Sequence, residues 1–175
     1  MAPFLSTGDL PDDYRTLADT VAAFARTVVA PVAAEHDAAH SFPYAVVAGM
    51  AEMGLFGLPI PEAFGGMGGD HFALCLAIEE LAKVDQSVAI TLEAGVSLGA
   101  MPILHFGTDA QRERWLPELA SGERLAGFGL TEADAGSDAG GTRTRAVLDE
   151  SAGEWVINGE KAFITNSGTP MTSLV

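Results

Sequence analysis

Residues 124–149 read RLAGFGLTEADAGSDAGGTRTRAVLD, and this stretch divides the chain into two parts of different structure. Before it, apolar residues recur every three or four positions, which is typical of helices; from Arg124 on they alternate, which is typical of strands. Because strands follow helices without alternating with them, we expect an α+β fold. It should comprise a helical domain at residues 1–122, packed beside an antiparallel sheet or barrel at residues 123–175, and not a doubly wound fold.

Local signals mark the first helices. Residues 13–40 form one apolar helix face, and Pro31 should kink or restart that helix. A second helix should run from Tyr44 to Met53 and end at Gly54, and Asp70 should cap the helix after the next loop. The apolar face of the first helix consists of Leu17, Val21, Phe24, Val28 and Val32.

The helical part ends with two further elements. Residues 86–106 are apolar nearly all round and rich in small residues, which indicates either a helix lining a ligand cavity or close helix packing. Thr108 and Gln111 form a capping box for a last helix that should end at Gly122.

The strand-like part contains four short alternating runs: RLAGFGLT, TRTRAVLD, EWVING and EKAFIT. The Asn158-Gly159 pair lies between the last two and predicts a hairpin turn there. Trp155 alternates with Ile157 and should face the core. The final MTSLV reads as the beginning of another strand, so we expect a truncated molecule with an open sheet edge.

Composition excludes several classes of partner. Nine basic and 24 acidic residues give a net charge of −15, which disfavours binding to nucleic acid or to an anionic membrane. We find no signal peptide and no run of about 20 uninterrupted apolar residues. The one cysteine, Cys75, excludes an internal disulfide. We therefore expect a soluble, cytoplasmic protein without a membrane span.

The loop after Thr131 can bind an anion only through main-chain amides, because its own side chains are acidic. Gly136, Gly140 and Gly141 permit unusual backbone conformations that would make an anion-binding nest, to which Ser137 adds a hydroxyl. Asp138 can accept amides of its own turn, and Glu132 can point away into a basic partner such as Arg143 or Arg145. A plain glycine-rich connection between two strands would look much the same.

Residues at two predicted strand ends indicate which kind of ligand could carry the anion. Thr131 and Thr165 place hydroxyls at the ends of strands, and Phe128 and Phe163 add aromatic rings. This combination suits a flat heteroaromatic ring with a pyrophosphate tail, such as a flavin. Ordinary strand threonines are the alternative.

Five motifs in order resemble the acyl-CoA dehydrogenase family over nearly the whole chain from about Asp9. They are APVAAEHD with its trailing FP, LPIPEAFGGMGGD, HFGTDAQRERWLPELASGE, GFGLTEADAGSDAGGTRTRA and GEWVINGEKAFITNSG. The resemblance implies a helical N-terminal domain, a middle β-barrel and a C-terminal helical domain that is absent here. It also implies an FAD-dependent oxidoreductase of fatty acid metabolism, which oxidises a saturated acyl-CoA to the trans-2-enoyl-CoA.

The resemblance assigns site residues by position. The first flavin segment includes Phe128, Leu130, Thr131, Gly136 and Ser137, and Ser137 also meets the thioester ligand. The second includes Phe163, Ile164 and Thr165, with the Thr165 hydroxyl facing flavin N5. Position 163 is Trp in many relatives, and Ala133-Asp134 replaces a common Pro-Gly or Pro-Asn. The family also implies electron-transfer flavoprotein as partner and a homo-oligomer.

The catalytic glutamate of the family lies in the missing C-terminal domain, so we expect the base outside this chain. An alternative is a non-catalytic subunit that completes a flavin and acyl-CoA site with another chain. We interpret Glu79 and Glu80 as surface or salt-bridge residues and Glu93 as a satisfied structural acid. The four histidines show no spacing typical of a metal site, and His105 should pack at its helix end.

Overall fold

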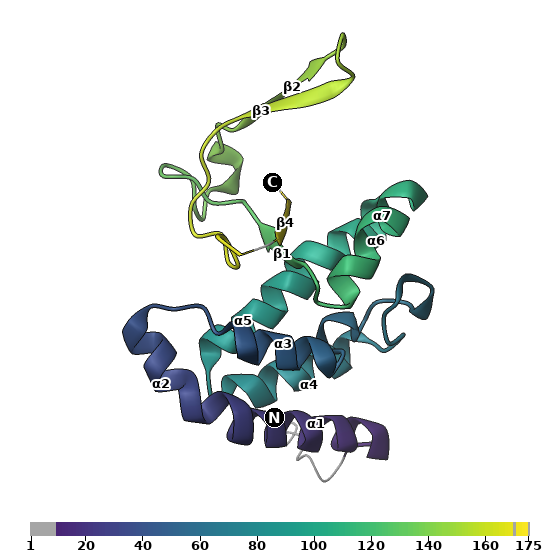
Figure 1. Ribbon diagram of the computed structural model, residues 1–175. Coiled ribbons are helices and arrows are strands. Elements are labelled where there is room, and N and C mark those ends of the chain that lie inside the picture. The colour runs from purple at the N-terminus through teal and green to yellow at the C-terminus, as the bar shows by residue number, and fades with distance from the viewer. Residues whose placement is uncertain (1–9, 170, 175) are drawn as a thin grey trace, which may run out of the picture.

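The first two helices form one continuous rod along the lower edge of the molecule in Figure 1. The computed structural model describes residues 10–169 and 171–174. The rod consists of α1 (Asp12–Phe24), a π-helical segment η2 (Ala25–Val29) and α2 (Ala30–Ala39). The π-helical segment directly precedes Pro31, which has no amide hydrogen to donate. The predicted interruption is therefore a local change of helix type, and the helix continues without ending there.

Helices α3 and α4 complete the layer that packs on this rod. The predicted end of α3 (Tyr44–Glu52) is confirmed, since Gly54 adopts a left-handed conformation with φ 74°. A loop with two 3₁₀ turns (Leu55–Gly57 and Glu62–Phe64) leads to α4 (His71–Ala82). Asp70 caps α4 as predicted, because its Oδ1 accepts a hydrogen bond from the Ala73 amide at 2.9 Å. Helix α1 packs against α4.

The central helix is mostly buried and packs against β1. It runs through α5 (Gln86–Glu93), a π-helical segment η5 (Ala94–Ala100) and α6 (Met101–Phe106), and β1 packs against η5. A Cβ atom built on Gly99 would lie 2.0 Å from the Ala126 Cβ. At this position the small residue therefore serves close packing, one of the two interpretations that the sequence left open.

Two of the helical rods are long and apolar enough to cross a membrane by length and composition alone, against the expectation from sequence. They are Asp12–Ala39 and Gln86–Phe106, and the second is mostly buried inside the protein. A buried core helix passes the same test, so this is weak evidence for a membrane protein.

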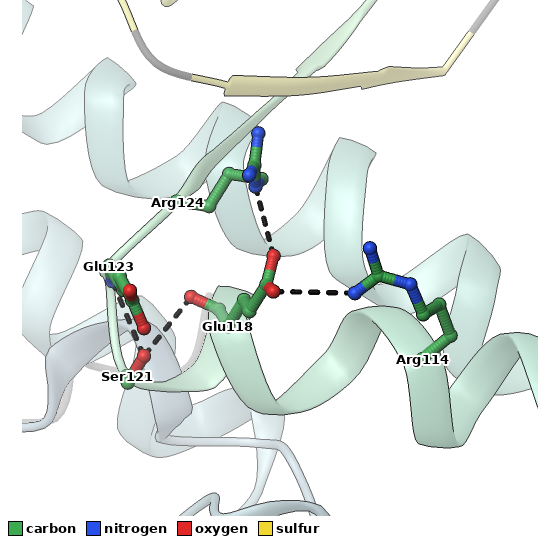
Figure 2. Close-up of polar contacts among 5 residues, drawn as sticks. All are labelled: Arg114, Glu118, Ser121, Glu123 and Arg124. Carbon is green, nitrogen blue, oxygen red and sulfur yellow. Dashed lines mark hydrogen bonds and ion pairs between the residues drawn. The ribbon is translucent and has the colours of Figure 1, made fainter.

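Helix α7 (Asp109–Ala120) leads into the strands through a turn fixed by polar contacts, shown in Figure 2. Its capping box at Thr108 is present as predicted. Near its end, Glu118 accepts hydrogen bonds from Arg124 Nε at 2.9 Å and from Arg114 Nη1 at 3.3 Å. Arg124 is the main cause that lowers the pKa of Glu118. These contacts hold Arg124 at the entry to β1.

Four strands form two separate pairs. β1 (Leu125–Phe128) pairs with β4 (Met171–Leu174) in parallel, and Leu125 lies opposite Met171. β2 (Arg145–Asp149) pairs with β3 (Glu154–Asn158) in antiparallel fashion, and Arg145 lies opposite Asn158. The helical part followed by strands is confirmed, and the predicted antiparallel pairing holds for β2 and β3.

Two local strand predictions are wrong. The hairpin turn lies between Asp149 and Glu154, where Gly153 has φ 68°, and not at Asn158-Gly159. Residues 161–165 form no strand, although EKAFIT has strand-like composition. The chain there is held by side-chain and single main-chain contacts to residues 130–132.

The β2–β3 ribbon projects away from the helices in Figure 1. Trp155 is 65% exposed, so the prediction that it faces the core is wrong for the described chain. The physical reason is that no other described element covers the ribbon, and every residue of both strands is exposed. A two-stranded ribbon alone offers each side chain only its cross-strand neighbours for packing.

Candidate functional site

The two segments predicted to form one site lie side by side. The Ala162 amide donates a hydrogen bond to the Thr131 carbonyl at 2.8 Å. A Cβ built on Gly129 would lie 3.3 Å from Lys161 Cγ and 3.6 Å from Ile164 Cδ1. The hydroxyl-bearing residues of both segments therefore belong to one surface region, although about 30 residues of chain separate them.

Glu132 joins these segments to the end of the glycine loop. Its Oε1 accepts hydrogen bonds from Lys161 Nζ at 2.8 Å and from Thr144 Oγ1 at 2.6 Å, and its Oε2 accepts one from the Arg143 amide at 2.6 Å. Lys161 is the first cause that holds the pKa of Glu132 far below its usual range. Glu132 therefore has a basic partner as predicted, but this partner is Lys161 and not one of the two arginines; the Arg143 side chain pairs with Asp134 at 3.1 Å.

The glycine loop is open to solvent. Gly136 and Ser137 are exposed, and a Cβ built on Gly136 would meet no atom within 4 Å. None of Gly136, Gly140 and Gly141 has a positive φ, so the predicted reliance on conformations closed to other residues is not found. In the 3₁₀ turn Ala139–Gly141, the Gly141 amide bonds to the carbonyl of Asp138 at 3.1 Å, not to its carboxylate.

Three of the predicted site hydroxyls have no intramolecular partner among the described residues. No side-chain hydrogen bond engages Thr131, Ser137 or Thr165 there, whereas Thr91, Thr144 and Thr169 all donate within the protein. Thr131 and Thr165 are half-buried and Ser137 is exposed. These hydroxyls remain free to bond an added polar group.

The aromatic residues of the site differ in their setting. Phe163 is 94% exposed and has φ 56°, a left-handed conformation that is costly for an aromatic residue. Phe128 and Ile164 are half-buried, and Leu130 is exposed. An outward ring on a strained backbone offers a flat apolar face that the described protein does not use itself.

A cavity of about 370 Å³ lies between the first segment and the ribbon. Its lining includes Thr142, Thr144 and Lys161 besides the first segment. Sequence reasoning missed Lys161 and Asn166 as site residues. Lys161 lies two residues before Phe163, and nothing in the local sequence indicates that it pairs with Glu132. Asn166 contacts residues 40 and 75 positions away. Only spatial neighbours reveal either role.

The remaining acids and histidines lie outside this site. Lys83 pairs with Glu79 at 3.3 Å and with Glu80 at 2.6 Å, which confirms the salt-bridge interpretation. Glu93 has no hydrogen bond among the described residues, so a satisfied structural role is not supported, and burial raises its pKa. His105 is exposed, against the prediction that it packs. In the described ranges no three His, Cys, Asp or Glu side chains gather as metal ligands.

Comparison with known proteins gives consistent matches. Residues 11–123 match the model of the acyl-CoA dehydrogenase N-terminal domain, and residues 127–175 match that of the middle domain. The probable acyl-CoA dehydrogenase YngJ of Bacillus subtilis is 44% identical over 95% of this chain and 43% of its own length.

Two solved structures show the same arrangement. An acyl-CoA dehydrogenase complexed with FAD from Bacillus anthracis superimposes with a TM-score of 0.90 at 35% identity, over 98% of this chain and 29% of that chain. A chain in the structure of the electron transferring flavoprotein of Acidaminococcus fermentans gives a TM-score of 0.90 at 42% identity, over 95% and 43%. The chain thus spans less than half the length of these relatives. With both domain models matched in order along almost its whole length, the chain belongs to the acyl-CoA dehydrogenase family.

Proposed function

We propose that the protein is an FAD-dependent acyl-CoA dehydrogenase, of which these residues supply the helical domain through Gly122 and the first part of the barrel from Glu123. The observation that carries the proposal is the contact of two separate segments through the Ala162–Thr131 hydrogen bond. The hydroxyls at that place have no partner among the described residues, and an aromatic ring points outward there. The relative from Bacillus anthracis is a complex with FAD, which supports the same cofactor here.

The described residues fit an aromatic dinucleotide in their chemistry. The free hydroxyls of Thr131 and Thr165 would bond the edge of the isoalloxazine, together with main-chain groups near Phe128, Leu130 and Ile164. Phe163 would cover a face of the ring. The open main chain at Gly136 and the Ser137 hydroxyl would meet the pyrophosphate, and Ser137 also the thioester ligand.

The bound flavin would supply the hydride acceptor, so that an acyl-CoA losing its α-proton to a carboxylate base and its β-hydrogen as hydride becomes the trans-2-enoyl-CoA. This chain would bind and orient the reactants. We assign no catalytic base among the described carboxylates. Glu79 and Glu80 are committed to Lys83, and Glu132 accepts hydrogen bonds on both of its oxygens.

The experiment is to purify the protein expressed from its complete reading frame and to measure bound flavin by absorbance, then bleaching on anaerobic addition of acyl-CoA. Thr131→Val and Thr165→Val should each weaken FAD binding by about three- to tenfold, the effect of one lost hydrogen bond. Thr20→Val serves as control, because this hydroxyl bonds only to the Thr16 carbonyl on α1. A wild-type protein that takes up no flavin would refute the proposal.

A second candidate is a non-catalytic subunit that completes a flavin and acyl-CoA site with another chain. It is supported by the ribbon of β2 and β3, whose apolar side chains Val147, Trp155 and Ile157 are exposed. Size-exclusion chromatography with and without a candidate partner separates the two. Turnover by the purified protein alone would exclude the subunit.

We further propose a cytoplasmic homo-oligomer that passes electrons to an electron-transfer flavoprotein. The family habit and the similar chain in the Acidaminococcus fermentans structure support this partner. Reoxidation of the substrate-reduced enzyme by added electron-transfer flavoprotein would test it. Light scattering would give the oligomeric state.

A further inference from the structure

In the ion pair of Glu132 and Lys161, both side chains are largely buried. Its two side chains are only 10% and 12% exposed, whereas in every other ion pair of the described residues at least one side chain is 32% exposed or more. Desolvating both charges costs free energy that a surface pair does not spend. A buried ion pair is therefore weak evidence that the pair stabilises the fold, and its presence here needs another explanation.

The polar atoms of this pair are well satisfied. Lys161 Nζ donates to Glu132 Oε1 at 2.8 Å and to the Leu130 carbonyl at 2.9 Å. The same Oε1 accepts from Thr144 Oγ1 at 2.6 Å and from the Thr144 amide at 3.0 Å, and Oε2 accepts from the Arg143 amide at 2.6 Å. Five hydrogen bonds thus converge on one lysine and one carboxylate.

These bonds join three separate segments. Residues 130–132 begin the glycine loop, residues 143–144 end it, and Lys161 begins the segment that carries Phe163 and Thr165. Both loop ends bond to the same carboxylate, so its position fixes the loop opening. The ammonium group fixes the distance from that opening to the second segment. Lys161 also packs close to the first segment, since a Cβ built on Gly129 would lie 3.3 Å from Lys161 Cγ.

We propose that Glu132 and Lys161 are positioning residues, which hold the glycine loop and the Phe163 segment at the spacing that FAD requires. The proposal rests on the proposed function and extends it to two residues that the sequence does not predict to bind the cofactor. Neutralising either partner leaves the other charge enclosed and unpaired, so the two ends of the glycine loop at residues 132 and 143–144 should move apart. The expected consequence is faster loss of FAD and a looser loop, with the helical domain unaffected.

The test compares Glu132→Gln and Lys161→Met with the control Asp134→Asn in the protein expressed from its complete reading frame. The control makes the same carboxylate-to-amide change in the same loop, but Asp134 and its partner Arg143 are largely exposed. Two quantities are measured: the FAD dissociation constant, and hydrogen exchange of the apoprotein in residues 132–144 and in α1 to α7. Lys161→Arg keeps the charge and tests for partial rescue.

We expect Glu132→Gln and Lys161→Met to weaken FAD binding about tenfold or more and to exchange faster in residues 132–144. Exchange in the helices should match wild type, which excludes general unfolding. The Asp134→Asn protein should match wild type in both measurements. FAD binding within twofold of wild type, or unchanged loop exchange in Glu132→Gln, would overturn the inference. A wild-type protein without FAD would refute the proposed function, and loop exchange would still decide whether the pair sets the loop.

Discussion

The side-chain amide of Asn166 donates a hydrogen bond to the carbonyl oxygen of Ala126, 40 positions earlier, with 2.9 Å between Nδ2 and O. A second, longer bond of 3.3 Å reaches the Thr91 carbonyl on α5. Asn166 is 6% exposed and has φ 69°, so one residue ties the turn after Thr165 to β1 and to the central helix. Its Oδ1 is buried without a partner among the described residues, which leaves one acceptor for a water molecule.

Substitutions at Asn166 should separate its backbone role from its side-chain role. Asn166→Gly keeps the left-handed conformation without strain and loses only the two hydrogen bonds, which should lower the free energy of unfolding by about 1–3 kcal/mol. Asn166→Ala also strains the backbone and should cost about 1 kcal/mol more. Urea denaturation measures both. Equal stability of the Gly and Ala variants would show that the positive φ carries no cost.

Phe163 should show a conflict between stability and binding. Since an aromatic residue at φ 56° is strained and its ring is exposed, Phe163→Gly should raise the free energy of unfolding of the apoprotein by about 1 kcal/mol. The same change removes the ring proposed to cover the flavin and should weaken FAD binding. Phe163→Ala loses the ring but keeps the strain, so it should bind FAD as poorly without gaining stability. If the Gly variant were less stable than wild type, the strain argument would fail.

The parts of the structure that were predictable from sequence depend on local chemistry. The Asp70 cap, the Thr108 capping box and the end of α3 at Gly54 each follow from residues within one turn of the helix end, and all three are present. The sequence also points to Thr131 and Thr165, and the structure brings their segments together.

What was missed depends on contacts between distant positions. The EKAFIT run ends in three strand formers, Phe, Ile and Thr, yet no strand forms there, and Lys161 bonds instead to Glu132, 29 positions earlier. Trp155 was assigned to the core from alternation alone, but alternation says which face a residue takes and not what covers that face. The parallel pairing of β1 with β4 joins positions 46 apart, from Leu125 to Met171, and no turn signal encodes it.

Tyr14 links α1 to the cap of α4, since its hydroxyl donates to Asp70 Oδ2 at 2.6 Å. This bond is the first cause of a raised pKa at Tyr14 and of a lowered pKa at Asp70. The contribution of Tyr14 to stability is therefore present below its unfolded pKa of about 10 and is lost as pH rises through the higher folded pKa. Tyr14→Phe should be less stable than wild type at pH 8, and this difference should shrink at alkaline pH.

Thermal unfolding across the alkaline range measures this difference for Tyr14. Tyr44→Phe is the matched control, because Tyr44 is exposed and its hydroxyl has no hydrogen bond among the described residues. A Tyr14→Phe protein as stable as wild type at pH 8 would mean that the short Tyr14–Asp70 bond does not hold the two helices.

Glu132 should contribute to the loss of folding stability at acid pH. Its pKa is held far below the usual range, first by Lys161 and then by Thr144 and the Arg143 amide, whereas the unfolded value is about 4.3. A depressed pKa contributes stability that is complete above the unfolded value and is lost as pH falls toward the folded one. Wild type should therefore lose stability more steeply below about pH 5 than Glu132→Gln, because the amide has no proton to take up.

Urea denaturation at successive pH values measures the stability of wild type, Glu132→Gln and Lys161→Met. The Lys161→Met curve should fall between the other two, because this change removes the largest cause of the lowered pKa of Glu132. Subtracting the curves cancels the other acids with lowered pKa values, Asp70, Glu118 and Asp149, since all three proteins contain them. If the stability of wild type and of Glu132→Gln fell in parallel below about pH 5, Lys161, Thr144 and the Arg143 amide would not hold this carboxylate in its charged form.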